Sequence, residues 1–130
     1  MNNRVFLASA ALLAGCVVAS ACATNEPFSQ LDGYRWNKVA LNTYDVTIVS
    51  VDGTSYIQRN VPIMIAPGQH KIVVQGPRTA GFKFGAERTL ELNVQPCTRY
   101  WLEARKTTAL SQDFEPAVNY EEPIAGCNRG

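Results

Sequence analysis

The chain has 130 residues, a length that suits one domain. Its charged fraction of 18% and hydrophobic fraction of 46% exclude a disordered polyelectrolyte and a multi-span membrane protein. The single histidine excludes mechanisms that need two imidazoles, and the formal net charge of +1 gives no electrostatic case for nucleic-acid binding.

The N-terminus has the pattern of a secretory signal: a positive start at Arg4, an apolar run over residues 5–13 and small residues after it. The run ends in Leu-Ala-Gly-Cys, with the cysteine at Cys16, and this motif resembles the lipobox of bacterial lipoproteins. The resemblance implies a helical signal peptide over residues 1–15, cleaved before Cys16, and a diacylglyceryl group on the Cys16 thiol. It also implies delivery to the outer membrane, facing the periplasm, because no Asp retention signal follows.

The number of cysteines favours two other positions for the mature N-terminus. A lipidated Cys16 would leave three thiols in an oxidising compartment, which is an odd number. Ala-Ser-Ala-Cys fits a relaxed lipobox and would make Cys22 the anchor. Ordinary cleavage before Thr24 would instead release a soluble, secreted periplasmic protein. In the first interpretation residues 16–30 are a flexible tether, and the mature chain carries 11 basic and 11 acidic side chains, because only Arg4 is removed.

Short apolar segments at 8–12-residue spacing begin at Leu31. Residues 34–41 predict a first extended segment. Residues 44–51, rich in β-branched side chains, predict a strand that ends at the tight turn Asp52-Gly53. Residues 63–75 predict a hairpin, because Pro67-Gly68 suits the centre of a type II turn.

The second half of the chain alternates more cleanly. After a glycine-rich loop over residues 76–86, the pattern predicts strands over 87–94 and 98–106, joined by a turn at Pro96-Cys97. Trp101 falls on the outward face and needs something to cover it. Residues 113–122 predict a last strand, and its inward-facing residues would be Phe114, Pro116, Val118 and Tyr120. The mature chain therefore predicts an all-β fold, a single immunoglobulin-like β-sandwich of about seven short strands over residues 31–130.

Two segments within residues 44–75 also resemble the PEGA-type, carbohydrate-binding-like β-sandwich. They are a strand that ends in Val-Asp-Gly at Gly53, and Val61 to Val74 with its Pro-Gly-Gln-His turn. The Pro-Glu-Gly-Ala letters themselves are absent, and Ala-Pro-Gly stands at the turn. The resemblance implies a PEGA-like surface or periplasmic module with no catalytic residues, and fold kinship alone does not imply a sugar ligand.

No set of residues predicts catalysis. His70 is expected to flank a tight turn, no serine lies in a Gly-x-Ser-x-Gly elbow, and no zinc, calcium or phosphate-binding pattern is present. The acidic cluster of Asp113, Glu115, Glu121 and Glu122 is expected to be a solvated face. We therefore expect no enzyme activity, no metal and no cofactor.

Two features remain as candidate sites. A disulfide between Cys97 and Cys127 would stabilise a small sandwich by linking the last segment to the sheet. The candidate binding surface combines aromatic and cationic residues, which are enriched where proteins bind partners: Arg78, Phe82, Lys83, Phe84, Arg88, Tyr100 and Trp101. The alternative for this loop is that Phe82 or Phe84 closes one end of the sandwich.

Three functions follow as hypotheses. The first is a non-enzymatic, lipid-anchored envelope protein that binds an unknown envelope protein as an interaction or accessory module. The second is a glycan- or peptidoglycan-binding module that uses Trp101, Tyr100 and the aromatic residues of the 76–88 loop. The third is a small secreted enzyme, which the missing catalytic set disfavours.

Overall fold

The computed structural model describes residues 26–34, 40–56 and 61–128. In these ranges the chain forms strands and no helix, which confirms the all-β prediction. The described residues form nine strands where about seven were expected: β1 (Ser29–Asp32), β2 (Thr43–Asp45), β3 (Thr47–Val51), β4 (Thr54–Ser55), β5 (Ile63–Ile65), β6 (Gly68–Gln75), β7 (Glu87–Val94), β8 (Thr98–Arg105) and β9 (Glu115–Pro123).

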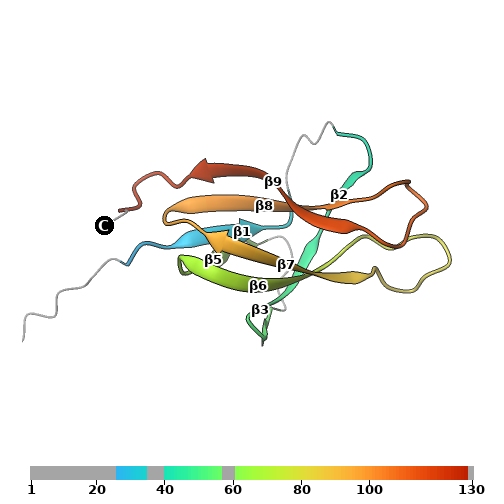
Figure 1. The fold of residues 1–130 in the computed structure, drawn as a ribbon, viewed down its shortest axis with the longest axis horizontal. Coiled ribbons are helices and arrows are strands. Elements are labelled where there is room, and N and C mark those ends of the chain that lie inside the picture. The colour runs from blue at the N-terminus through green and yellow to red at the C-terminus, as the bar shows by residue number, and fades with distance from the viewer. Residues whose placement is uncertain (1–25, 35–39, 57–60, 129–130) are drawn as a thin grey trace, which may run out of the picture.

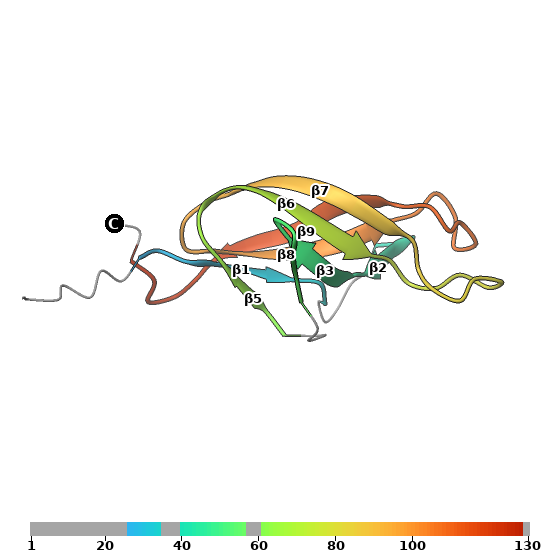
Figure 2. The same ribbon diagram turned by 90° about the horizontal axis from the view of Figure 1, so that it is seen from below.

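The strands form two sheets that pack as a sandwich (Figures 1 and 2). In the first sheet β8 is central: β9 pairs antiparallel along one side of it, and β1 and β2 share the other side, with β5 beyond β1. In the second sheet the order is β4-β3-β6-β7, and every described pair is antiparallel. β1 pairs parallel with β8, and two parallel strands need a long connection between them. The chain makes this connection by passing through strands of the second sheet.

The core lies between the two sheets and is built by the alternation of β-strands. β8 contributes Tyr100, Leu102 and Ala104, all buried, as the pattern of this strand predicts. From the opposite sheet Ile72, Val74 and Val94 belong to the same buried cluster. Burial of each large side chain contributes about 1.5–3 kcal/mol, and this packing fixes which face of each strand remains available for contacts.

The predicted hairpin over residues 63–75 is wrong. β5 pairs antiparallel with β1 in the first sheet, whereas β6 pairs with β3 and β7 in the second. Ala66 and Pro67 therefore carry the chain from one sheet to the other, and β6 begins at Gly68, whose φ of 122° is strained for other residues. The turn residues correctly marked a reversal of direction, but they carry no information about the pairing partner.

The predicted strand over residues 44–51 also divides between the sheets. Val46 is the point of change: β2 before it belongs to the first sheet and β3 after it to the second. The Val46 N–H donates to the Gly33 carbonyl (3.0 Å), and a Cβ on Gly33 would lie 2.0 Å from the Val46 oxygen. A glycine is therefore required where the chain passes this close to itself.

The first strand begins earlier than predicted. Ser29 and Gln30, assigned from the sequence to the tether, belong to β1, and Ser29 is buried. The expected extended segment over residues 34–41 falls largely outside the described residues; Tyr34, Ala40 and Leu41 are described and lie outside strands. The predicted signal peptide and the candidate anchors Cys16 and Cys22 lie outside the described residues as well.

The last strand forms where predicted, but its far end faces the other way. Tyr120 pairs with Trp101 and Val118 with Leu102, so the intervening Asn119 is a β-bulge. Beyond the bulge Tyr120 lies on the outer face with Trp101, and it is exposed, whereas the sequence placed it in the core. Phe114, buried at the start of this segment, and Val118, packed against the core, agree with the prediction.

Candidate interaction surface

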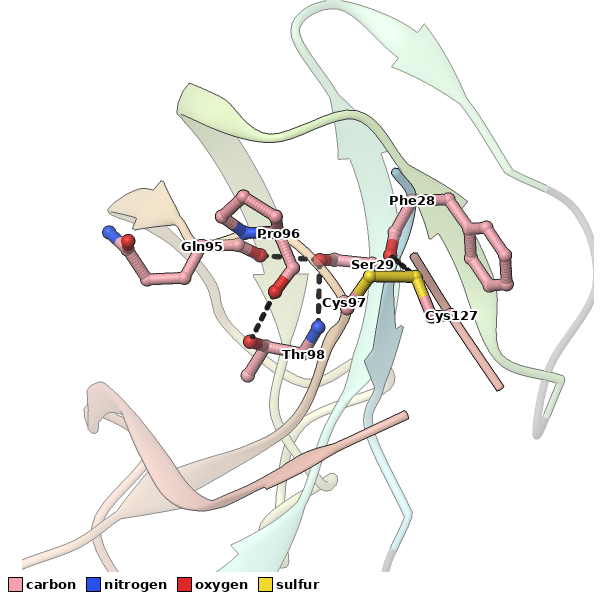
Figure 3. The surroundings of a disulfide bond; sticks show 7 residues. All are labelled: Phe28, Ser29, Gln95, Pro96, Cys97, Thr98 and Cys127. Atoms are coloured by element: carbon pink, nitrogen blue, oxygen red, sulfur yellow. Dashed lines mark hydrogen bonds between the residues drawn. A yellow bond between two sulfur atoms is a disulfide. The ribbon is translucent and has the colours of Figure 1, made fainter. Parts of the chain in front are cut away.

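One end of the sandwich is tied together by a disulfide. The sulfur atoms of Cys97 and Cys127 lie 2.00 Å apart, which agrees with the predicted pair (Figure 3). The buried Ser29 hydroxyl donates to the Gln95 carbonyl (2.5 Å) and accepts from the Thr98 N–H (3.0 Å). The start of β1, the β7–β8 turn and the C-terminal segment therefore meet at this tether end.

The opposite end is formed by two loops, at the right of Figures 1 and 2. We call residues 76–86, between β6 and β7, and residues 106–112, between β8 and β9, the tip. Two glycines close the neck of the first loop: Gly76 donates to the Ala86 carbonyl (2.9 Å), and a Cβ on Gly85 would lie 1.8 Å from the Gly76 oxygen. The narrow neck follows from residues that lack a Cβ.

Hydrogen bonds join the two loops of the tip side by side. The Thr79 hydroxyl donates to the Ser111 carbonyl (3.2 Å), and the Gln112 side-chain amide donates to the Phe84 carbonyl (2.9 Å). At the base, the Lys106 ammonium, in a side chain only 7% exposed, donates to the Thr79 hydroxyl (3.1 Å). The loops therefore present their remaining side chains in a defined arrangement.

Three large apolar side chains of the tip are exposed: Phe82 at 55%, Phe84 at 65% and Leu110 at 80%. The alternative that Phe82 or Phe84 closes the end of the sandwich is therefore wrong. Phe114 does so instead, because its ring is buried and lies where a Cβ on Gly76 would be. Leu110 is not among the surface residues predicted from the sequence, although a lone leucine among the polar residues of that loop is a signal for it.

Cations accompany these apolar groups. Arg78 and Lys83 are exposed, and the Lys83 ammonium lies 5.4 Å from the Phe84 ring centroid. Arg88 is different, because its guanidinium forms an ion pair with Asp113 (2.5 Å) at the base of the tip. The Arg88 hydrogen bond, followed by that of the Phe114 N–H, holds the pKa of the Asp113 carboxyl below its ordinary value. Of the predicted acidic cluster, Glu115 and Glu121 are exposed.

Tyr100 and Trp101 do not join this surface. Tyr100, predicted both as a core residue and as a binding residue, is 2% exposed, and its hydroxyl accepts from the Gln95 N–H (2.8 Å). Because its side chain is buried in the core, Tyr100 cannot contact a ligand. Trp101 points to the other side of β8, as alternation requires, and is covered by Arg99 (4.5 Å to the ring centroid) and Tyr120 (5.6 Å between centroids).

His70 lies within β6 and does not flank a hairpin turn, because β5 and β6 belong to different sheets. Its Nδ1 contacts the Asp52 carboxylate (2.5 Å) and its Nε2 the Ala66 carbonyl (2.7 Å), which links the β3–β4 turn to the segment between the sheets. The Lys71 N–H (2.8 Å), and then His70, lower the pKa of the Asp52 carboxyl.

A cavity of about 350 Å³ lies beside the second tip loop and is lined by Arg105, Lys106, Thr107, Ser111, Asp113, Phe114 and Glu115. Its two cations and two carboxylates favour neither an anionic nor a cationic ligand. Within the described ranges no three His, Cys, Asp or Glu side chains are grouped to hold a metal ion. The same ranges hold no helix that is long and apolar enough to cross a membrane.

Comparison with known proteins found no matching family model, no similar curated protein and no similar solved structure. The lipobox and PEGA resemblances therefore stay predictions from the sequence.

Proposed function

We propose that the chain is a non-enzymatic, lipid-anchored protein of the cell envelope and that its sandwich is an interaction module. The observation that carries this proposal is the tip, where Phe82, Phe84 and Leu110 are exposed on loops held together by hydrogen bonds. Solvent-exposed apolar groups of this size, gathered at one end of a domain, favour a contact with another surface. In this proposal the anchor is Cys16, and the outer membrane is its location.

The disulfide supports export. Structural disulfides persist in oxidising compartments and are rare in the cytosol. The pair Cys97–Cys127 lies at the tether end, close to Phe28, whose carbonyl accepts from the Cys97 N–H (3.1 Å). The first described residues therefore leave the domain at the end away from the tip, so an anchored chain would direct the tip away from its anchor (Figure 1).

Two measurements test the proposal. The intact mass of the envelope form should equal residues 16–130 plus an acylated glyceryl group; a species that lacks residues 1–23 and carries no acyl mass would rule out the anchor. In cells, a photo-crosslinking residue in place of Leu110 should give an adduct with protein or with lipid, whereas the same residue in place of Met64, also exposed but on β5, should not. Equal labelling from both positions would contradict a specific tip contact.

A second candidate function is glycan or peptidoglycan binding on the outer face of the first sheet. Trp101 and Tyr120 favour it, because aromatic rings side by side on a sheet surface suit the apolar faces of sugars. Purified cell-wall glycan should then retain the protein, and Trp101→Ala should abolish retention without loss of folding as measured by circular dichroism. No retention of the wild-type chain would exclude this function.

A further inference from the structure

The tip separates positive charge from negative charge. Its two segments, residues 76–86 and 106–112, contain Arg78, Lys83 and Lys106 and no acidic residue, so all 11 carboxylates of the chain's side chains lie elsewhere. Two acidic residues directly adjoin the tip in sequence: Asp113 is already paired with Arg88, and Glu87 is the first residue of β7. Although the mature chain is electrically balanced, this end of the molecule therefore favours an anionic surface.

The exposed apolar side chains of the tip are few, and they come from separate loops. Phe82 and Phe84 flank Lys83 on one loop, and Leu110 stands on the other. A third segment joins them at the base, where the Lys106 N–H donates to the Asn42 carbonyl (2.9 Å), and its Leu41 is 92% exposed. The described structure thus places four exposed apolar side chains on three neighbouring loops.

This arrangement suits a lipid surface better than a protein partner. A stable protein interface buries about 800 Å² on each side and needs matching shapes. Three apolar side chains on two loops offer little such area, but a fluid bilayer accommodates them without shape complementarity. Aromatic rings and aliphatic groups enter the boundary between headgroups and acyl chains, while flanking lysines and arginines remain at the phosphates.

We infer that the tip binds anionic lipid surfaces, with Phe82, Phe84 and Leu110 entering the interface and Arg78 and Lys83 contacting lipid phosphates. The contact is separate from the N-terminal acyl group and lies at the far end of the domain from it. A chain anchored through Cys16 would therefore hold two membrane surfaces together, and an unanchored chain would bind one of them reversibly.

The test distinguishes vesicle binding by the tip from vesicle binding by the N-terminal acyl group. The mature chain, as isolated from cells, is mixed with phosphatidylcholine donor vesicles and then with sucrose-loaded acceptor vesicles, made of phosphatidylcholine with or without phosphatidylglycerol. An acylated chain stays in the donors and an unacylated chain stays in solution. In both cases, sedimentation with the acceptors therefore reports a membrane contact that the acyl group does not make. We expect at least about tenfold more sedimentation with the anionic acceptors, and a decrease as salt is raised.

Variants identify the residues. The triple variant Phe82→Ser, Phe84→Ser, Leu110→Ser should lower binding to anionic acceptors by at least about tenfold, because each side chain loses its transfer from water. Lys83→Glu should lower it by about tenfold at low salt. Met64→Ser, an exposed apolar residue on β5, is the matched control and should bind like the wild type. The urea midpoints of all variants should agree, since each altered side chain is exposed.

Three outcomes would overturn the inference: equal sedimentation with neutral and anionic acceptors, unchanged binding by the triple variant, or no capture by acceptor vesicles. If capture fails while the crosslinker at Leu110 labels one protein, the tip serves a protein partner and the interaction module stands. If the intact mass shows no acyl group while capture persists, the anchor is wrong and the lipid contact stands.

Discussion

A single phenylalanine, Phe114, closes the core at the tip end of the sandwich. It is buried, whereas Phe82 and Phe84 are more than half exposed. We expect Phe114→Ala to cost about 3–5 kcal/mol of the free energy of unfolding, because it leaves a cavity below Gly76. Phe82→Ala and Phe84→Ala should each change this free energy by less than about 0.5 kcal/mol. Urea denaturation of the three variants gives the comparison, and a large loss in Phe82→Ala would contradict the assigned roles.

Single residues also show where sequence reasoning fails. Ser29 is buried and satisfies two backbone groups of the β7–β8 turn, yet a serine before a strand gives no sign of this role, because its partners lie 66 and 69 residues away. Tyr100 was assigned to the core by alternation and to a binding surface by its chemistry. Burial shows that alternation was the better guide, since a strand fixes the side on which each residue lies.

At the scale of elements, strands with regular alternation were predictable. β7 has the bounds that the sequence predicted, and β8 ends one residue before its predicted end. Elements whose position depends on their pairing partner were not predictable. Residues 44–51 divide at Val46 between the two sheets, and β5 and β6 belong to different sheets instead of forming one hairpin. The bulge at Asn119 likewise reverses the face of Tyr120. Local periodicity reports which face is apolar, but partner choice is decided by contacts between distant segments.

The neck of the first tip loop gives an element-scale prediction. Gly85→Ala places a Cβ 1.8 Å from the Gly76 oxygen, so the neck must open, and the hydrogen bonds from Gly76 to Ala86 and from Gln112 to Phe84 should weaken. Gly81→Ala is the matched control, because its site is open and only its φ of 90° is unfavourable. We expect a loss of about 1–2 kcal/mol for Gly81→Ala and a clearly larger loss for Gly85→Ala.

Amide hydrogen exchange locates the effect. Gly85→Ala should speed exchange at Gly76 and leave that of Leu102, in the centre of β8, in step with global unfolding. Equal stability of the two glycine variants would show that the close approach at the neck does not constrain the loop.

The disulfide acts on the tether end as a whole. Cys97 and Cys127 are 30 residues apart, and a crosslink that closes a loop of this size contributes about 3–4 kcal/mol by restricting the unfolded chain. The double variant Cys97→Ser, Cys127→Ser should lose about this free energy of unfolding. A reductant should destabilise the wild-type chain to the same degree and leave the double variant unchanged. An effect of reductant on the double variant would mean that another thiol matters.

For the whole molecule, the sequence predicted the two sheets and the disulfide pair, but only part of the site. Five of its seven candidate surface residues lie at the tip or its base: Arg78, Phe82, Lys83, Phe84 and Arg88. They are close together in sequence, so the loop that carries them was visible. The partner loop with Leu110 lies about 25 residues further on, and it reaches the tip only because the chain reverses direction between β7 in one sheet and β8 in the other. Charge segregation at one end is therefore a property of the fold.

Acid should destabilise the whole molecule through two carboxylates in particular. The pKa values of Asp52 and Asp113 lie below the ordinary value, because the Lys71 N–H and His70 donate to the first and Arg88 and the Phe114 N–H donate to the second. Near the unfolded pKa of about 4, the unfolded chain therefore binds more protons than the folded one. The stabilisation that these groups supply is fully present above that pH and is lost as the pH falls through their lower folded pKa values.

The comparison of Asp52→Asn, Asp113→Asn and their combination with the wild type tests this linkage. At pH 7 each variant should have a lower urea midpoint than the wild type, and the gap should narrow as the pH falls from about 5 toward 2, because protonation removes the same interactions from the wild type. Both carboxylates are exposed, so added salt should reduce the Arg88–Asp113 contribution. Glu121→Gln, a change of an exposed carboxylate on β9, is the control and should follow the wild type. A gap that stays constant over this range would show that the two aspartates stabilise the fold without regard to their charge.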